Sequence, residues 1–362
     1  MIIAYIMKMG QFRFPLEKLY QFGDYINKYL RTPKKINNST IISIGNLTTG
    51  GTGKTPTVIF LIELLKPLKR RAAILTRGYG GSVYREGAIL SDGKKIYLTE
   101  QESGDEPYLL ACNLKDVPIA VGRKRFKNGK NLSEKYKTDL FILDDGFQHY
   151  NLHRDVDIVL IDAVNPFGNG HILPHGNLRE SPEALSRCDV VIITKSDLVS
   201  EEECNLLVEK IKRYAGHSNI FRSMHKPDSL VKLPVALESL DSGVKKEKPG
   251  KIKNSIVWAL SGIGNHRAFV KTLENLGAKN VRSISYRDHH RYSESDVASI
   301  LKRVAKDDIL ITTEKDWIRL HYYKDKFSHL KSFYYLKIKL DMSEKEQKLL
   351  RNLISEKITR KK

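Results

Sequence analysis

Short runs of β-branched and aliphatic residues recur along the first part of the chain, with helical or loop segments between them. The clearest of these runs are Ala72–Thr76, Val117–Val121, Leu140–Leu143, Val156–Ile161 and Val190–Thr194. Near-continuous apolar strands that alternate with helices are typical of a parallel sheet covered on both faces. We therefore predict an α/β fold whose ligands bind beyond the carboxyl ends of the strands.

A change in composition marks the end of this pattern. Residues Asp241–Asn254 are rich in lysine, glycine and serine, which is typical of a linker. A second α/β pattern follows, with predicted strands at Ile256–Leu260, Ile309–Thr313 and Phe333–Leu340 and a capping box that begins a last helix at Ser343. We predict a core over residues 1–232, a linker over 233–254 and a smaller α/β domain with a C-terminal helix over 255–362. A chain of 362 residues is long enough for two domains.

One strand-to-helix junction carries a glycine-rich loop. The apolar run Ile41–Ile44 leads into it, and a helical pattern with its apolar side at Val58, Ile59, Leu61, Ile62 and Leu65 follows. The loop itself consists of Gly50, Gly51, Thr52, Gly53, Lys54 and Thr55. Glycines let backbone N–H groups approach phosphates, the lysine reaches the β- and γ-phosphates, and the hydroxyl can hold Mg²⁺. The junction predicts a nucleotide phosphate site, although Thr48 stands where the usual first glycine of such a loop would be.

Polar residues follow two of the predicted strands. Asp144 and Asp145 come directly after Leu140–Leu143, where a P-loop enzyme carries the acid that holds Mg²⁺. Adjacent aspartates at a strand end also suit turns and helix caps, but the phosphate loop favours the metal role. Arg77, which follows Ala72–Thr76, offers a guanidinium group to a phosphate.

Two motifs remain open on the residues alone. Asp105 precedes a helical stretch, so it suits the N-cap of that helix as well as a base that accepts the proton of an attacking hydroxyl. The residues Thr194–Asp197 are similar to the base-reading motif of GTPases, although four residues are weak evidence.

The formal net charge is +20, with 62 basic and 42 acidic residues, so an anionic partner fits this chain. Residues Phe12–Arg31 mix aromatic, aliphatic and basic side chains, a pattern that suits a helix on an anionic bilayer or a helix packed on its own domain. The chain has no apolar run of 18 residues, so we expect no membrane-spanning helix. Three cysteines without metal-ligand spacing fit the cytoplasm.

Several motifs, taken in order, resemble one known family, the tetraacyldisaccharide 4'-kinases that phosphorylate a lipid A precursor. The resemblance covers roughly residues 12–340, and Thr48 is part of it, whereas Thr49 departs slightly from the family pattern. The matching segments are Ile44–Pro56, Arg77–Tyr79, Gly104–Pro107, Asp144–His149, Leu178–Glu180, Gly262–Asn265, Asp288–His289 and Thr313–Asp316.

The resemblance implies an activity and a set of roles. The γ-phosphate of ATP would pass to the 4'-hydroxyl of an acylated glucosamine disaccharide 1-phosphate, giving lipid IVA. Asp105 would accept the hydroxyl proton, oriented by His289 from the second domain across a cleft. The Mg²⁺ ligands would come from Thr55, Asp144, Asp145 and Glu180. The protein would sit peripherally on the cytoplasmic face of the bacterial inner membrane, with Phe12–Arg31 against the anionic surface.

Two other classes of function compete with this interpretation. A P-loop GTPase or assembly ATPase acting on a protein partner would also carry the glycine loop and Thr194–Asp197. A nucleic-acid-binding protein would fit the positive charge, but the charge is scattered along the chain and no binding module is evident. We therefore expect no nucleic-acid partner.

Overall fold

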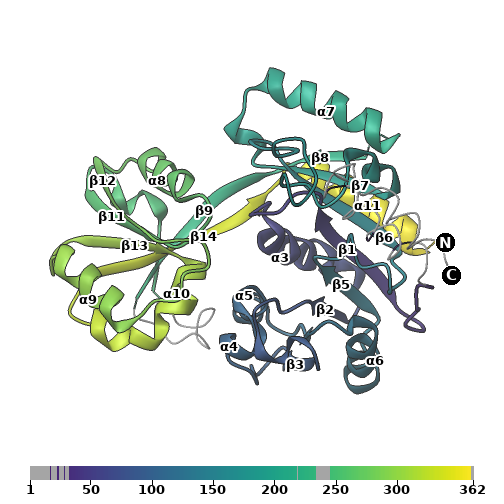
Figure 1. The fold of residues 1–362 in the computed structure, drawn as a ribbon, viewed down its shortest axis with the longest axis horizontal. Coiled ribbons are helices and arrows are strands. Elements are labelled where there is room, and N and C mark those ends of the chain that lie inside the picture. Colours follow the sequence, from purple (N-terminus) through teal and green to yellow (C-terminus); the bar gives the residue numbers. More distant parts are fainter. Residues whose placement is uncertain are drawn as a thin grey trace, which may run out of the picture.

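The computed structural model describes residues 17, 23, 28, 32–217, 219–233 and 245–359. These residues form two α/β lobes, each built on its own sheet, and two long strands run between them (Figure 1). The strands are β9 (Met224–Lys232) and β14 (Ser332–Asp341), which pair antiparallel along their length. The α/β fold with a large parallel sheet is confirmed.

The sheet of the larger lobe has the order β3-β4-β2-β5-β1-β6-β7-β8 in the described part of the chain. All its neighbours pair in parallel except β3, which runs antiparallel to β4 at one edge. The strands are β1 (Thr40–Asn46), β2 (Ala72–Thr76), β3 (Ala88–Ser91), β4 (Ile119–Val121), β5 (Leu140–Asp144), β6 (Val156–Asp162), β7 (Val190–Thr194) and β8 (Ile220–Arg222). The five apolar runs of the sequence therefore each overlap a strand of this sheet.

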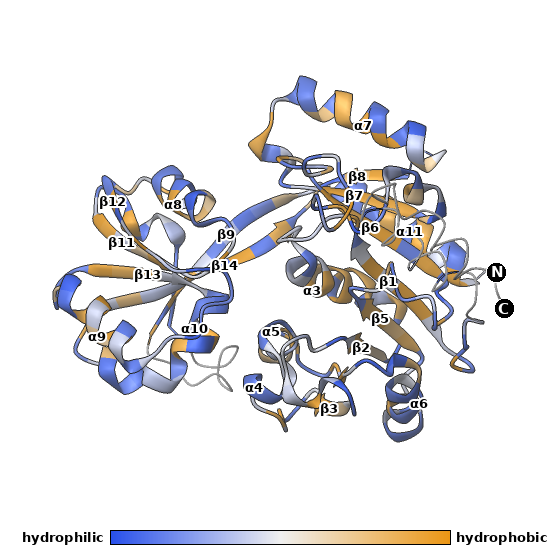
Figure 2. Cartoon of the chain, viewed as in Figure 1, coloured by the Kyte–Doolittle hydropathy of each residue, from blue (hydrophilic) through white to orange (hydrophobic). Residues whose placement is uncertain are grey.

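Helices cover both faces of the larger sheet. Strand β6 shows why, because Ile158 and Leu160 are buried on one side and Val159 and Ile161 on the other. Figure 2 shows these strands as the apolar centre of the lobe. One face packs against α3 (Lys54–Leu65), α5 (Asp105–Asn113) and α11 (Glu344–Thr359), and the other against α6 (Arg125–Tyr136) and α7 (Glu201–Ala215). The short helix α4 (Glu100–Ser103) precedes α5.

The smaller lobe has a six-stranded sheet in the order β10-β9-β14-β13-β11-β12. Its other strands are β10 (Lys246–Glu247), β11 (Ile256–Ser261), β12 (Asn280–Ser285) and β13 (Ile309–Thr313). Helix α8 (His266–Asn275) packs on one face, and α9 (Glu294–Arg303) and α10 (Glu314–Leu320) pack on the other. One hydrophobic cluster runs through both lobes, because Leu109 and Leu110 of α5 share it with Trp317 and Ile318 of α10.

The lobes exchange segments of chain. Strand β9 lies within the predicted core range but pairs in the smaller sheet, and α11 follows the smaller lobe in sequence but packs on the larger one. We therefore propose β9 and β14 as the connection between the lobes. Residues 234–244, half of the predicted linker, lie outside the described residues, as does Phe12–Arg31 apart from Glu17, Gly23 and Lys28. Within the described ranges, no helix is long and apolar enough to cross a bilayer.

Candidate active site

The glycine loop lies between β1 and α3, and neighbouring elements fix its backbone. Gly53 has a φ of 86°, in the left-handed region that favours glycine, and caps the first turn of α3. The Thr194 hydroxyl at the end of β7 donates to the Thr52 carbonyl at 3.1 Å, and the Lys195 ammonium donates to the Gly51 carbonyl at 3.3 Å. A GTPase-like motif predicts that these residues extend toward a nucleotide base. Thr194 and Lys195 instead hold the glycine loop.

The loop lysine already faces an acidic group. Its Nζ lies 3.3 Å from Oδ1 of Asn46 and 3.7 Å from Oδ1 of Asp145. Thr55 follows Lys54 in the first turn of α3 and is buried. That turn carries no acidic side chain, so the positive end of the helix dipole and its free N–H groups are open to an anion.

Three carboxylates gather beside this lysine. Burial raises the pKa of Asp144 to about 6, helped by the charges of Glu106 and Asp145. Burial works against ionisation of Asp145, but the charges of Lys54, Arg179 and Arg125 keep its pKa below the usual value. The Lys315 ammonium, 2.6 Å from Glu106, lowers the pKa of that carboxylate. Asp144 is buried and Asp145 and Glu106 are partly buried, so these like charges repel one another and a cation would relieve the repulsion.

This arrangement fits Mg²⁺ held together with a nucleotide. In the described part of the chain, no three His, Cys, Asp or Glu side chains already form a metal cage. Mg²⁺ usually takes one or two carboxylates and completes its octahedron with phosphates and waters. Asp144 and Asp145 lie at the carboxyl end of β5, beside β1 and the glycine loop, so they are placed for that role.

Glu180 and Arg77 have partners of their own. The Glu180 carboxylate pairs with Arg187 at 2.8 Å and accepts from Tyr150 at 3.0 Å and from Gln148 at 2.9 Å. Gln148 also donates to the carbonyl of Asn46, so Glu180 is linked to the end of β1. Arg77 is exposed, and its guanidinium donates to the Tyr84 hydroxyl at 3.0 Å.

The structure brings Asp105 and His289 together across the lobes. Asp105 is the first residue of α5, and Gly104 occupies the N-cap position before it without a side-chain cap. His289 lies in the turn after β12, with a φ of 57°. Nδ1 of His289 is 3.5 Å from Oδ2 of Asp105. The hydrogen bond with Asp105 raises the pKa of His289.

Sequence reasoning missed several charged residues of this site. Arg319 of α10 donates from Nε to Oδ2 of Asp105 at 2.6 Å, and Arg179 makes two bonds to Asp145 at 2.8 and 3.0 Å. Glu106 and Lys315 join the lobes close by. Arg179, Glu106 and Lys315 all stand in motifs that carried the resemblance, whereas Arg319 lies four residues after Lys315, on the same side of a helix.

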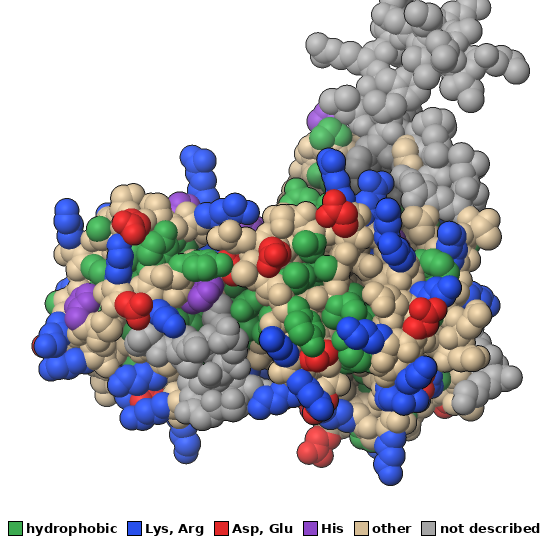
Figure 3. Space-filling model, turned by 90° about the horizontal axis from the view of Figure 1, so that it is seen from below, with side chains coloured by type: hydrophobic (Ala, Val, Ile, Leu, Met, Phe, Trp, Pro, Cys, Tyr) green, Lys and Arg blue, Asp and Glu red, His purple; other side chains and the backbone are tan. Residues whose placement is uncertain are grey.

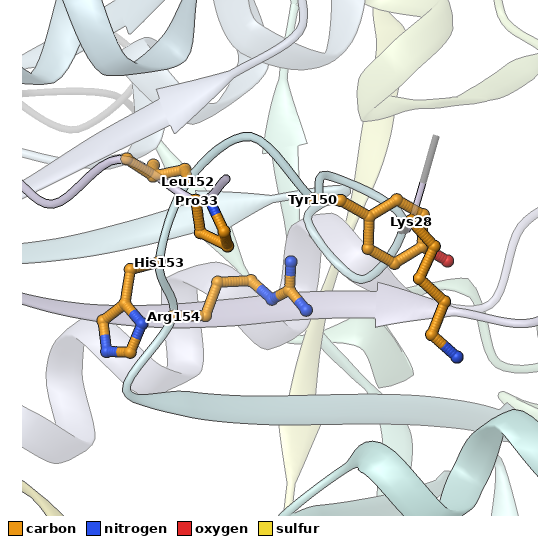
Figure 4. A pocket seen from close by; sticks show the side chains of 6 residues that line it. All are labelled: Lys28, Pro33, Tyr150, Leu152, His153 and Arg154. Carbon is orange, nitrogen blue, oxygen red and sulfur yellow. The ribbon is translucent and has the colours of Figure 1, made fainter. Parts of the chain in front are cut away.

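A shallow pocket lies on another part of the larger lobe (Figure 4). Its lining residues are Lys28, Pro33, Tyr150, Leu152, His153 and Arg154. The Arg154 guanidinium lies 5.9 Å from the centre of the Tyr150 ring and pairs with Asp157 at 2.7 Å. Since Tyr150 also donates to Glu180, this pocket is connected to the site through one side chain.

On the face seen in Figure 3, the positive side chains of the described residues do not form one continuous stripe. Figure 3 shows lysine and arginine side chains spread over the visible face of both lobes, with acidic side chains among them. Proteins that follow a nucleic-acid backbone concentrate such charges along one face. The visible face therefore gives no support to the nucleic-acid alternative.

Comparisons with known proteins point to one family. A family model described as tetraacyldisaccharide-1-P 4'-kinase matches residues 12–358. A tetraacyldisaccharide 4'-kinase of Syntrophus aciditrophicus is 45% identical over 289 residues, which are 77% of this chain and 75% of that protein. Another, of Halothermothrix orenii, is 36% identical over 312 residues, or 84% and 81% of the two chains. The crystal structure of LpxK from Aquifex aeolicus in complex with ATP is 29% identical and matches with a TM-score of 0.72 over 99% of both chains.

Proposed function

The chain belongs to the tetraacyldisaccharide-1-phosphate 4'-kinase family, and on that premise we propose that it moves the γ-phosphate of ATP to the 4'-hydroxyl of an acylated glucosamine disaccharide 1-phosphate. The match confirms the resemblance carried by the sequence motifs. The observation that supports the reaction best is the approach of Asp105, from the lobe with the phosphate loop, to His289 from the other lobe.

The residues of this chain divide the reaction between them. Asp105 accepts the proton of the 4'-hydroxyl while the hydroxyl oxygen forms its bond to the γ-phosphorus. The bond from that phosphorus to the bridging oxygen breaks, and ADP leaves with the electron pair. Lys54 balances the charge on the phosphates, and the N-terminus of α3 with Gly50–Thr55 binds them through backbone N–H groups.

Mg²⁺ held by Asp144, Asp145 and the Thr55 hydroxyl would supply further positive charge to the phosphates. Glu180 does not bind the Mg²⁺ directly in this proposal, since its oxygens already accept from Arg187, Tyr150 and Gln148. Glu180 thus fixes Gln148 and the end of β1 beside Lys54. Arg77 binds a phosphate oxygen once its guanidinium gives up the hydrogen bond to the Tyr84 hydroxyl.

The direct test is an assay of the purified protein with ATP, Mg²⁺ and the acylated disaccharide 1-phosphate in detergent. We expect one phosphate per acceptor, placed on the 4'-oxygen, and no reaction when the acceptor lacks that hydroxyl. A GTPase acting on a protein partner behaves differently, since it hydrolyses GTP without any sugar. Rapid GTP hydrolysis in the absence of acceptor, with no phosphorylated lipid formed, would therefore reject this function.

The substrate is a lipid, so the protein meets it at the cytoplasmic face of the inner membrane, as a peripheral protein. The segment Phe12–Arg31 supplies basic and aromatic side chains for that contact. Each lysine or arginine near an anionic surface contributes about 1 kcal/mol.

Charge reversal in this segment tests the membrane contact. Changing Arg13, Lys18 and Lys28 to glutamate should release most of the protein from vesicles that contain an anionic lipid, because repulsion replaces attraction. Co-sedimentation measures the bound fraction, and vesicles of neutral lipid serve as the control. If the triple variant sediments as the wild type does, this segment is not the membrane contact.

A further inference from the structure

Arg319 lies between the two residues to which we assign the proton transfer. It belongs to α10 of the smaller lobe, and its side chain is only 4% exposed. Nε donates to Oδ2 of Asp105 at 2.6 Å, and Nη2 lies 3.2 Å from Nδ1 of His289. One planar guanidinium therefore contacts both members of the pair. We propose that Arg319 is a positioning residue, which holds Asp105 and His289 in their reactive arrangement across the two lobes; this inference rests on the proposed function.

The arginine is itself fixed from behind. Its Nη1 donates to the carbonyl of Gly262 at 3.1 Å and lies 3.5 Å from Oδ1 of Asp316. Asp316 is fully buried and accepts from the backbone N–H of Gly262 and from the Tyr292 hydroxyl, both at 3.0 Å. A guanidinium held in this way loses little further freedom when it orients a carboxylate. The smaller lobe thus presents a rigid fork to a residue of the larger lobe.

The contact with His289 also fixes where the imidazole carries its proton. A guanidinium has only donors, so Nδ1 must accept from Nη2 and a neutral ring must carry its hydrogen on Nε2. The same Nδ1 lies 3.5 Å from Oδ2 of Asp105, and it could donate to that oxygen only with a proton of its own. The two contacts therefore exclude each other, and the shorter one belongs to Arg319. Oδ2 of Asp105 then accepts from Arg319, which leaves Oδ1 for the substrate hydroxyl.

Charge from several elements reaches this pair. Burial favours the neutral form of Asp105, but Arg319, through its hydrogen bond and its charge, and His289, when its ring is protonated on Nδ1 and donates to Asp105, outweigh burial and hold the pKa of Asp105 below its usual value. Asp288 and Lys315 also act on His289, from its own loop and from α10. Since Asp105 must be ionised to accept a proton, Arg319 extends activity to lower pH.

The test compares Arg319→Gln with the wild type in the lipid kinase assay. We expect kcat to fall at least tenfold, with the KM for ATP within about twofold, because the glycine loop is untouched. The acid limb of the pH profile of kcat/KM for the acceptor should move to higher pH, since Asp105 loses a neighbouring positive charge. Arg319→Lys keeps the charge but not the fork, so the limb should stay near its wild-type position while kcat recovers only in part.

Asn113→Ala is the matched control. Asn113 of α5 donates to Glu314 of α10 at 2.9 Å, so this variant removes a bond between the same two helices without touching the pair. It should leave kcat and the acid limb unchanged. The inference is overturned if Arg319→Gln keeps the wild-type kcat and limb, or if Asn113→Ala reproduces its changes.

A measurement on the wild-type protein covers the case in which Arg319→Gln does not fold. Nitrogen-15 NMR of histidine-labelled protein, assigned with His289→Gln, should show neutral His289 with its proton on Nε2 and Nδ1 as an acceptor. A proton on Nδ1 would contradict the proposed contact. The inference and the proposed function can fail separately. A wild-type protein that makes no phosphorylated lipid rejects the function. If the wild type is active, Asp105→Asn is inactive and Arg319→Gln keeps the wild-type kcat and acid limb, only the role of Arg319 is rejected.

Discussion

Asp144 is kept at a cost to the stability of the folded chain. It is 5% exposed, and the Thr76 hydroxyl donates to its Oδ2 at 2.8 Å. Its pKa rises from 3.8 to about 6 on folding, mainly through burial. An acid whose folded pKa is raised destabilises the fold above its unfolded pKa, because the unfolded chain ionises more easily. Such a cost is typical of a residue retained for a ligand rather than for packing.

Replacement of Asp144 separates its effect on stability from its role in ligand binding. Asp144→Asn keeps an acceptor for Thr76 and removes the buried charge, so we expect the free energy of unfolding at pH 8 to rise by about 3 kcal/mol. The gain should shrink as the pH is lowered from 8 towards 3, because Asp144 is mostly protonated in both states at pH 3. Kinase activity should fall at least a hundredfold. Thermal unfolding at several pH values measures the first effect, and a loss of stability at pH 8 would contradict the assignment.

The sequence pattern and the family resemblance predicted the residues around the glycine loop but not Arg319. Lys54, Thr55, Asp144 and Asp145 follow predicted strands or lie in motifs, so their meeting at one edge of a sheet could be predicted. Arg319 could not, because its partner Asp105 lies 214 residues away and the contact depends on how two lobes pack. Lys54 and Asp145 are in contact within the larger lobe, whereas Arg319 and Asp105 belong to different lobes.

At the scale of elements, strand β9 reaches the phosphate loop. His225, near the start of β9, lies so close to Gly53 that a Cβ added there would be 2.5 Å from its ring. Burial lowers the pKa of His225 to about 4, so the ring is neutral. The connection that we propose between the lobes therefore begins directly against the glycine loop.

Gly53→Ala tests this close approach. A left-handed φ costs a residue with a Cβ about 1–3 kcal/mol, and the contact with His225 adds to it. We expect lower stability in the absence of nucleotide and ATP binding weakened at least tenfold, measured by chemical unfolding and by calorimetric titration. Gly51→Ala is the control for stability, because its Cβ would meet nothing within 4 Å. Equal stability of both variants would show that His225 and the loop are not tightly packed.

The sequence pattern did not predict β9 as a strand. Its residues Met224–Lys232 include lysines, a proline and an aspartate, and they do not form an apolar run. Much of this strand connects the lobes, where only its end, Leu230 and Val231, enters a core. Its pairing with β14 is set by tertiary structure rather than by local preference. Strand β14, by contrast, was predicted from the run Phe333–Leu340, and the structure buries Phe333–Leu336.

At the scale of the whole molecule, the end of the chain stabilises its beginning. Helix α11 follows the last strand of the smaller lobe and returns to the larger one, where Leu350 and Ile354 are fully buried in the same cluster as α3. The capping box predicted its start, with Ser343 accepting from the backbone of Glu346. Its destination depends on the paired strands β9 and β14 and could not be predicted from the local pattern.

Leu350→Ala tests this return. Loss of a fully buried leucine costs about 2–5 kcal/mol, and we expect the loss to lower the unfolding temperature of the larger lobe, which carries the glycine loop. Leu349→Ala is a close control, because Leu349 is 51% exposed and should change stability by less than about 0.5 kcal/mol. Calorimetry with and without ATP identifies the lobe that is affected. If ATP raises the temperature of a transition that Leu350→Ala leaves unchanged, α11 does not stabilise that lobe.

The measurement that tests the central claim most directly is the single-turnover rate of phosphate transfer to the lipid acceptor in Asp105→Asn, with ATP affinity measured on the same sample. Asparagine keeps the size of the side chain and cannot accept the proton. We expect ATP to bind within about twofold of wild type and the transfer step to slow by a factor of about 100 or more. Transfer within tenfold of the wild-type rate, at equal ATP affinity, would contradict the claim that the hydroxyl is activated by Asp105 between the two lobes.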